Sequence, residues 1–135
     1  MTEEYLEDIG KYMSSPVSSI DSELTVQEAA QQMHAKKVGA LLVRVYDKFV
    51  GILTETDLTR KVIAKGLNTE TTLVSSIMTK TILSMDRYMP VEEAEEFMKK
   101  KNIRHLAVTE EGEIVGILSV KDLVSCYSKS FRMVE

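Results

Sequence analysis

Apolar residues in the first half of the chain alternate between the spacing of strands and that of helices. A short strand is predicted at residues 17–20, and apolar runs predict strands at residues 40–45, interrupted only by Arg44, and 49–53. Between the first two strands, helical spacing gives one apolar face made of Val26, Ala29, Ala30 and Met33. Thr25 and Glu28 have the spacing of a capping box, which marks the start of this helix. A second helix is expected from about 54 to 65, where Gly66 is placed to end it.

The second half of the chain follows the same order of strand, helix, strand, strand and helix. Its strands are predicted at residues 82–85, 106–108 and 114–118. Pro90 suits the first turn of the helix that follows the first of them. The apolar faces of the two helices are Val91, Ala94, Phe97 and Met98, then Val120, Leu123, Val124 and Tyr127. Residues 68–75 are predicted to be a polar linker, and the first dozen and last half-dozen residues to be appendages.

Comparison of the chain with itself explains this parallel order. Shifted by 65 residues, the sequence has sixteen identities over the 46 positions from 13 to 58, without a gap. The longest identical run, Val-Gly-Ile-Leu, places residues 50–53 on 115–118. Unrelated segments match at few positions, so we interpret the chain as a duplication. We predict an α/β fold of two pseudo-symmetric β-α-β-β-α repeats, at residues 8–66 and 74–130.

Composition and charge narrow the classes of function. The net charge of -4 and the pI of about 5.3 argue against general binding to nucleic acid, which needs a positive surface. No run of about 18 apolar residues is present, so no membrane-spanning segment is expected. The single cysteine, Cys126, excludes a disulfide within the chain and favours a reducing compartment. We therefore expect a cytoplasmic protein without a nucleic-acid or membrane partner.

Each repeat carries the same short motif at the end of its last strand. The first copy reads Gly-Ile-Leu-Thr-Glu-Thr-Asp over residues 51–57, and the second reads Gly-Ile-Leu-Ser-Val-Lys-Asp over residues 116–122. A hydroxyl residue follows the strand, and an aspartate comes three positions later. His34, His105 and Cys126 have no metal-ligand spacing, and no nucleophile stands with a recognisable base. Neither a metal site nor a catalytic site is predicted.

Two interpretations of this motif remain open. Ser or Thr followed three residues later by an acid is a helix-capping pattern, which needs no ligand. The same geometry suits a nucleotide, because the N–H groups at a helix start attract phosphate and an aspartate can accept two hydrogen bonds from a ribose diol. The glycine would let a ligand approach the strand closely. The interpretations are compatible, since an empty site would be capped by its own side chains.

Two features of the chain resemble the CBS domain family. One is the duplicated motif G-h-x-T/S-x-x-D, in which h is an apolar residue and x is any residue, and the other is the stretch Asn-Ile-Arg-His-Leu-Ala-Val at residues 102–108. The resemblance covers nearly the whole chain. It implies that the two repeats form one Bateman module, which binds AMP, ADP, ATP or S-adenosylmethionine in clefts between the repeats. It also implies a homodimer, and a signal delivered to an effector protein in trans.

The resemblance further implies which residues form each site. One site would combine the first motif with residues of the second repeat: Ile52, Thr54, Thr56, Asp57, Thr81, Ile82, Arg104 and His105. The other would combine Val17, Ser18, Ser119, Lys121 and Asp122. Gly39 and Ala40 stand where the other site would need counterparts of Arg104 and His105, so a charged ligand is expected to prefer the first site. A surface arginine also needs no ligand, and a histidine here also suits a structural role.

The predicted function is that of a regulatory module with an adenine nucleotide as its ligand and no required cofactor. Two alternatives stay open, namely an interaction or dimerisation module whose sites bind nothing, and a sensor of S-adenosylmethionine. An enzyme ranks last, because the sequence offers no aligned nucleophile and base.

Overall fold

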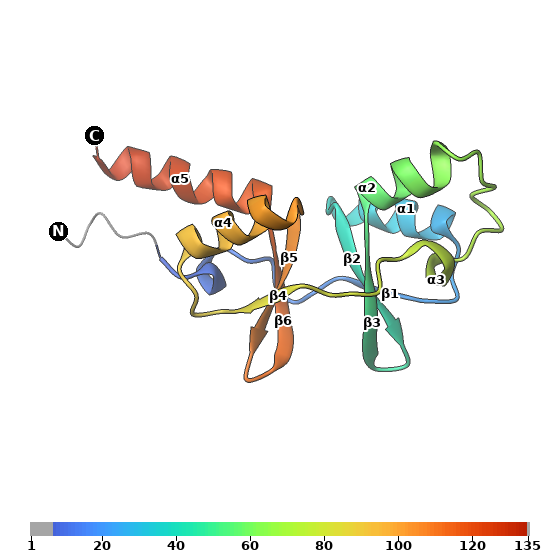
Figure 1. The fold of residues 1–135 in the computed structure, drawn as a ribbon, viewed down its shortest axis with the longest axis horizontal. Helices are drawn as coiled ribbons and strands as arrows, with labels where there is room; N and C mark the ends of the chain where they lie inside the picture. The colour runs from blue at the N-terminus through green and yellow to red at the C-terminus, as the bar shows by residue number, and fades with distance from the viewer. Residues whose placement is uncertain (1–6, 135) are drawn as a thin grey trace. The chain divides into compact units, whose positions relative to one another are not determined.

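The computed structural model describes residues 7–134, with side chains as far as Ser128. The chain forms two compact units (Figure 1). The first unit is Ser18–Ile82, and the second unit combines residues 7–17 with 83–134. Each unit contains a three-stranded sheet with its own helices. The predicted α/β fold of two repeats is therefore confirmed.

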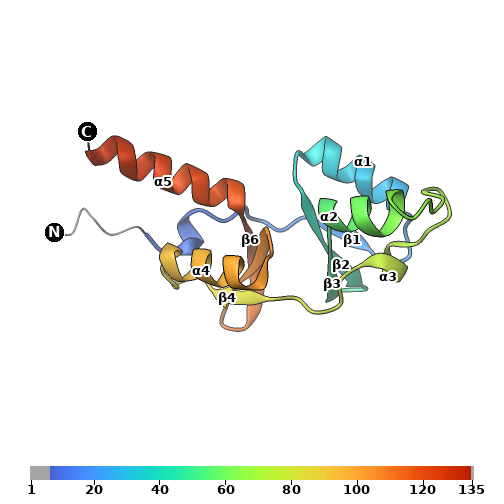
Figure 2. The ribbon, with the colours of Figure 1, turned by 45° about the horizontal axis from the view of Figure 1, so that its top comes forward.

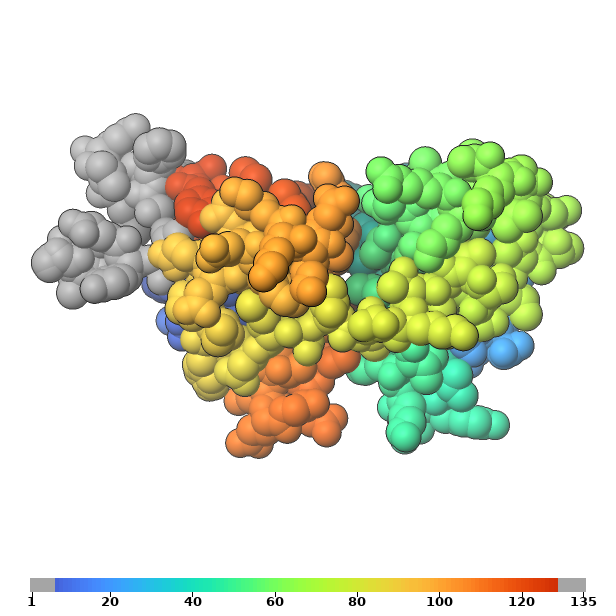
Figure 3. All heavy atoms as spheres, viewed as in Figure 1, coloured from blue at the N-terminus to red at the C-terminus, as the bar shows by residue number. Residues whose placement is uncertain are grey.

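The first unit is built on a sheet with the strand order β1–β2–β3. Its strands are β1 (Ser19–Asp21), β2 (Ala40–Val45) and β3 (Lys48–Thr54). β1 is parallel to β2, which requires the helical crossover between them, and β2 is antiparallel to β3, which a tight turn allows. The β2–β3 hairpin projects beyond the rest of its unit (Figure 3). Apolar side chains of the sheet and of the crossover helix form the core: Ile20, Val26, Ala29, Met33, Leu41, Val43 and Leu53.

Helix α1 (Val26–Lys36) begins at the predicted capping box. The Glu28 N–H donates to Thr25 Oγ1 at 3.2 Å, and the Thr25 N–H donates to Glu28 Oε1 at 2.9 Å. The helix ends at Lys37, whose φ of 58° is left-handed. Ala30, which the apolar pattern assigns to the buried face, is exposed. The helix face that meets the sheet is narrower than the apolar face that the residue spacing predicts.

The second predicted helix of this unit is not a single α-helix. One α-helical turn, α2 (Glu55–Asp57), continues as a π-helix, η3 (Leu58–Ile63). Its hydrogen bonds span five residues, as from the Ala64 N–H to the Thr59 carbonyl at 2.9 Å. Apolar periodicity over so few turns does not distinguish the two kinds of helix. Gly66 follows with a φ of 69°, in agreement with its predicted role at the end of the segment.

The predicted linker at residues 68–75 is an integral part of the first unit. Helix α3 (Val74–Ile77) begins within it, and its first and last side chains are buried in the same core as α1. The preceding residues are tied to α1, since the Val26 N–H donates to the Thr72 carbonyl at 2.9 Å. A four-residue helix is too short to leave a periodic pattern, which is why the linker prediction is wrong here.

The second unit repeats this arrangement of a sheet with helices (Figure 2), and its strand order is β4–β5–β6. Its strands are β4 (Ser84–Asp86), β5 (His105–Glu110) and β6 (Glu113–Ser119). Its helices are α4 (Val91–Lys101) and α5 (Val120–Val134). Pro90 is the N-cap of α4, one position before the first turn in which the sequence predicts it. Side chains of the sheet and of α4 form its core: Val91, Ala94, Met98, Leu106, Val108 and Leu118.

The predicted terminal appendages differ from the structure where it describes them. A 3₁₀-helix, η2 (Ile9–Lys11), places the Ile9 side chain fully buried in the core of the second unit. The Ile9 N–H donates to the Met89 carbonyl at 3.0 Å, so this segment is anchored by its backbone as well. Residues 1–6 lie outside the described residues, and the last residues continue α5 as far as Val134.

Candidate ligand-binding site

The first motif lies at the junction between β3 and α2. Thr54 ends the strand and caps the helix, because its Oγ1 accepts from the Asp57 N–H at 3.3 Å. In return, Asp57 Oδ2 accepts from the Thr54 N–H at 3.0 Å. Asp57 is buried, with only 6% of its surface exposed. The capping interpretation is therefore confirmed at this motif.

Two residues that the sequence analysis missed complete the surroundings of Asp57. Lys61 Nζ lies 3.0 Å from Asp57 Oδ1, and Thr79 Oγ1 donates to the same oxygen at 3.3 Å. The Lys61 ammonium also donates to the Ile77 carbonyl at 3.1 Å. The i,i+4 spacing of an acid and a lysine is a known signal for an ion pair on a helix and could have identified Lys61. Thr79 is 22 residues from Asp57 and leaves no such signal.

The second motif has the same cap and different surroundings. Ser119 Oγ accepts from the Asp122 N–H at 3.1 Å, and Asp122 Oδ2 accepts from the Ser119 N–H at 2.8 Å. Asp122 is half-buried. The shift of 65 residues puts Cys126 and Ser14 where the first unit has Lys61 and Thr79. Among the side chains described, Asp122 makes no ion pair and hydrogen-bonds only to Ser119.

Strand pairing brings the start of β5 beside the second motif. His105 lies opposite Ser119 in the sheet, and the first N–H of α5 donates to the Arg104 carbonyl at 3.1 Å. Arg104 is exposed and His105 is half-buried. In the first unit, Ala40 lies opposite Thr54 in the same way. Arg104 and His105 thus share a unit with the Ser119 motif, whereas the resemblance pairs them with the Thr54 motif of the first unit.

The remaining candidate ligand residues are distributed over both units. The first unit holds Ser18, Ile52, Thr56, Thr81 and Ile82, and the second unit holds Val17 and Lys121. Ile52 is buried, and its N–H and carbonyl both pair with Thr79 at 2.9 Å. Its backbone is therefore already satisfied. Thr56, Thr81 and Lys121 have exposed side chains, which leaves them accessible to a ligand.

The glycines of the two motifs do not serve the approach of a ligand. A Cβ on Gly51 would lie 2.8 Å from the Thr79 carbonyl oxygen and 2.8 Å from Met78 Sδ. A Cβ on Gly116 would lie 2.9 Å from the Ser14 carbonyl oxygen. The space beside each glycine is filled by another segment of the same unit, so the ligand interpretation of the glycines is wrong. Glycine is needed there because a second backbone packs against the strand.

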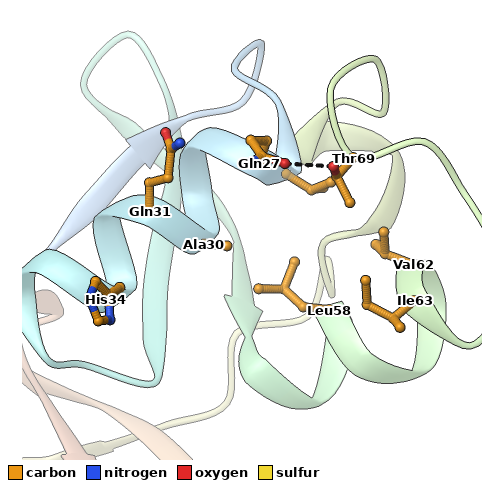
Figure 4. Close-up of a pocket in the computed structure, with 9 residues that line it drawn as sticks. Gln27, Ala30, Gln31, His34, Leu58, Val62, Ile63 and Thr69 are labelled. Carbon is orange, nitrogen blue, oxygen red and sulfur yellow. Dashed lines mark hydrogen bonds between the residues drawn. The ribbon is translucent and has the colours of Figure 1, made fainter.

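A separate cavity of about 410 Å³ lies between α1 and η3 in the first unit (Figure 4). Its lining includes Val26, Ala30, His34, Leu58, Val62 and Ile63. Gln27 accepts a hydrogen bond from Thr69 Oγ1 at 2.6 Å at one end of the cavity. In the second unit, where Tyr127 replaces Val62, the Tyr127 hydroxyl donates to Glu95 Oε1 at 2.7 Å and bridges α5 to α4. The cavity contains no residue of either motif and is not the predicted ligand site.

The Tyr127 contact makes stability depend on pH. Burial, with the neighbouring Glu95 carboxylate, raises the pKa of Tyr127 above its ordinary value of about 10. The folded chain holds this proton more tightly, so the contribution to stability is complete below about pH 10 and is lost as the pH rises through the folded pKa. We expect Tyr127→Phe to lower the unfolding free energy by about 0.5–1.5 kcal/mol at about pH 8. Urea unfolding should show this difference shrinking above about pH 10, and a constant difference would contradict the assignment.

The comparisons with known proteins agree with the duplicated architecture. The model of the CBS domain matches residues 6–64 and 74–129. The chain belongs to the CBS domain family. It is a CBS domain pair, a kind of module that is typically regulatory and ligand-binding.

Similar proteins come from plants and bacteria. The CBS domain-containing protein CBSCBSPB5 of Arabidopsis thaliana is 37% identical over 120 residues, which cover 87% of this chain and 22% of that protein. This chain thus spans about a fifth of that relative's length. The CBS domain-containing protein YhcV of Bacillus subtilis is 32% identical over 111 residues, which cover 82% of this chain and 79% of YhcV.

Solved structures share the fold over most of their length. An uncharacterised conserved protein from Pyrococcus horikoshii superposes with a TM-score of 0.84 at 32% identity, covering 90% of this chain and 92% of that one. The CBS domain pair of MJ0100, in complex with 5′-methylthioadenosine and S-adenosyl-L-methionine, has a TM-score of 0.81 at 23% identity, covering 92% and 98%. At that identity the likeness to MJ0100 shows the fold alone.

The described residues also offer no metal site or membrane span. No group of three or more His, Cys, Asp or Glu side chains among them lies close enough to hold a metal ion. None of the helices in the described part of the chain combines the length and apolar character needed to cross a bilayer.

Proposed function

We propose that this CBS domain pair is a regulatory module whose ligand contains adenosine, with AMP, ADP or ATP as the first candidates. The observation that carries the proposal is the Asp122 carboxylate, which has one oxygen engaged by the Ser119 cap. Its other oxygen has no partner among the side chains described. A ribose diol supplies two O–H donors, which a carboxylate with free acceptor sites can bind.

The residues around Asp122 suit the phosphate of a nucleotide. His105 begins the strand that pairs beside Ser119, Arg104 precedes it, and Lys121 is exposed next to Asp122. An arginine contributes a charge-assisted contact to a phosphate, and the positive end of the α5 dipole favours an anion. We therefore propose that the second unit contributes the stronger half-site, that is, the stronger of the two sets of ligand residues that the units supply. Val17 is a further candidate in this set. Candidates for the second half-site are Ser18, Ile52, Thr54, Thr56, Asp57, Thr81 and Ile82.

S-Adenosylmethionine is the second candidate ligand. It is supported by the MJ0100 pair, which was crystallised with two adenosine compounds. The ligand would act as a regulator if it binds one conformation more tightly than another. A homodimer and an effector protein bound in trans are the proposed means of output, and the proposal includes no catalysed reaction.

Calorimetric titration of the chain with AMP, ADP, ATP, S-adenosylmethionine and adenosine tests the proposal, with GMP as the control for the base. The expected dissociation constant for at least one adenosine compound lies between about 1 μM and 1 mM. Equal heats with AMP and GMP would remove the adenine assignment. No heat with any compound would favour the alternative of an interaction module, for which sedimentation should then show a dimer that no nucleotide changes.

A further inference from the structure

The carboxylate of Asp57 has no acceptor capacity left for a ligand. Oδ2 accepts from the Thr54 N–H at 3.0 Å and from the Thr54 hydroxyl at 3.3 Å. Oδ1 lies 3.0 Å from Lys61 Nζ and accepts from the Thr79 hydroxyl at 3.3 Å. A carboxylate offers about four lone-pair sites, so a ribose hydroxyl must displace one of these donors to bind.

Lys61 is the hardest of these donors to replace, because it carries the charge. Charge-assisted hydrogen bonds are roughly twice as strong as neutral ones. The Lys61 ammonium is also held in place by the Ile77 carbonyl at 3.1 Å and the Thr79 hydroxyl at 3.4 Å. It therefore cannot leave Asp57 without losing other contacts.

The second unit lacks this competitor. Cys126, a buried residue, occupies the position that corresponds to Lys61 and cannot supply an ammonium. Asp122 keeps its cap to Ser119 and forms no ion pair among the described side chains. The same motif thus presents an engaged carboxylate in the first unit and an available one in the second.

We infer that Lys61 is a specificity-determining residue that makes the two aspartates unequal ribose ligands. The inference rests on the proposed function and extends the ribose contact proposed for Asp122 to Asp57. Lys61 competes with the diol for Asp57, so adenosine binds more tightly at Asp122. The first unit then fills only at ligand concentrations above those that fill the second, which gives the module two thresholds of response.

The test compares adenosine binding by the full chain carrying Asp122→Asn with binding by Asp122→Asn/Lys61→Met, so that heat reports on the Asp57 site. We expect Lys61→Met to tighten adenosine binding about fivefold, the effect of releasing one partly exposed ion pair. Arg60→Met in the same background is the matched control, because Arg60 is an exposed neighbouring cation, and it should leave the affinity unchanged. 2′,3′-Dideoxyadenosine, which has no diol, should bind all three proteins alike.

A second variant, Lys61→Gln, keeps an uncharged donor and guards against a loss of folding in Lys61→Met. It should tighten binding by less than the methionine does, with melting curves recorded for each protein. The inference is overturned if adenosine binds equally tightly to the Lys61→Met, Lys61→Gln and Arg60→Met proteins. The proposed function still stands in that case if the unsubstituted chain binds adenosine. No binding of any adenosine compound to the unsubstituted chain overturns the proposed function, and the inference with it.

Discussion

Asp57→Ala is expected to lower the unfolding free energy by about 2–3 kcal/mol, and Asp122→Ala by only about 1 kcal/mol. Both substitutions remove a capping carboxylate, which accounts for about 1 kcal/mol in each unit. Asp57→Ala also leaves Lys61 without its anion and Thr79 without its acceptor, beside a site that is buried in the folded chain. Urea unfolding of the two variants, followed by circular dichroism, measures the difference.

Lys61→Met separates the two contributions to the stability of the Asp57 site. It removes the ion pair and leaves the Thr54 cap intact, so we expect a loss of about 1 kcal/mol, limited because 41% of the Lys61 side chain is exposed to solvent. The double variant Asp57→Ala/Lys61→Met should be at most about 0.5 kcal/mol less stable than Asp57→Ala alone. Equal losses in Asp57→Ala and Asp122→Ala would show that Lys61 and Thr79 add nothing to the cap.

The parts of the fold that could be predicted from the sequence are those that depend on residues close together in the chain. The capping box at Thr25 and Glu28, the end of a segment at Gly66 and the Pro90 helix start each depend on residues within one turn of each other. The duplication supported the order of the elements, because the apolar pattern of strand, helix, strand, strand and helix occurs twice. Strands of six or seven residues with continuous apolar character were located for the same reason.

The parts that could not be predicted depend on short elements and on distant contacts. Ile9 and α3 contribute buried side chains from elements of three and four residues, which are too short to show a period. The contact of Thr79 with Asp57 joins residues far apart in the sequence. The packing role of Gly51 depends on the same distant segment. Because the sequence does not show that contact, the glycine is interpreted from the sequence as a place where a ligand could approach the strand.

The sequence contains a signal that places Arg104 near the second motif to within one residue of the strand pairing. A turn at Glu111 and Gly112 connects the two strands of the second hairpin, and the turn fixes which residues lie opposite each other. Counting outward from it places His105 opposite Leu118, and a one-residue bulge between Val108 and Thr109 shifts the pairing so that His105 lies opposite Ser119. The register of the hairpin thus associates Arg104 with the second motif, whereas the resemblance associates it with the first.

Arg104→Ala is expected to weaken AMP binding by about 10- to 100-fold and adenosine binding by less than about twofold. The guanidinium would make a charge-assisted contact with the phosphate, and adenosine has no phosphate to lose. Arg104 is exposed, and its side chain makes no ion pair or hydrogen bond among the described residues, so its removal should leave the melting temperature nearly unchanged. Calorimetric titration of both ligands against both proteins measures the two ratios.

Two backgrounds show which motif Arg104 serves. In the Asp57→Asn background only the Ser119 motif keeps its carboxylate, and Arg104→Ala should still weaken AMP binding strongly. In the Asp122→Asn background the effect of Arg104→Ala should be lost if Arg104 acts beside Ser119, as the strand register indicates. Lys100→Ala is the matched control, because it removes an equal charge from an exposed position on α4 and should change AMP affinity by less than about twofold. If Arg104→Ala weakens AMP and adenosine by the same factor, Arg104 is not a phosphate ligand. If its effect on AMP persists only in the Asp122→Asn background, the arginine serves the Thr54 motif, and the stronger half-site lies with Asp57.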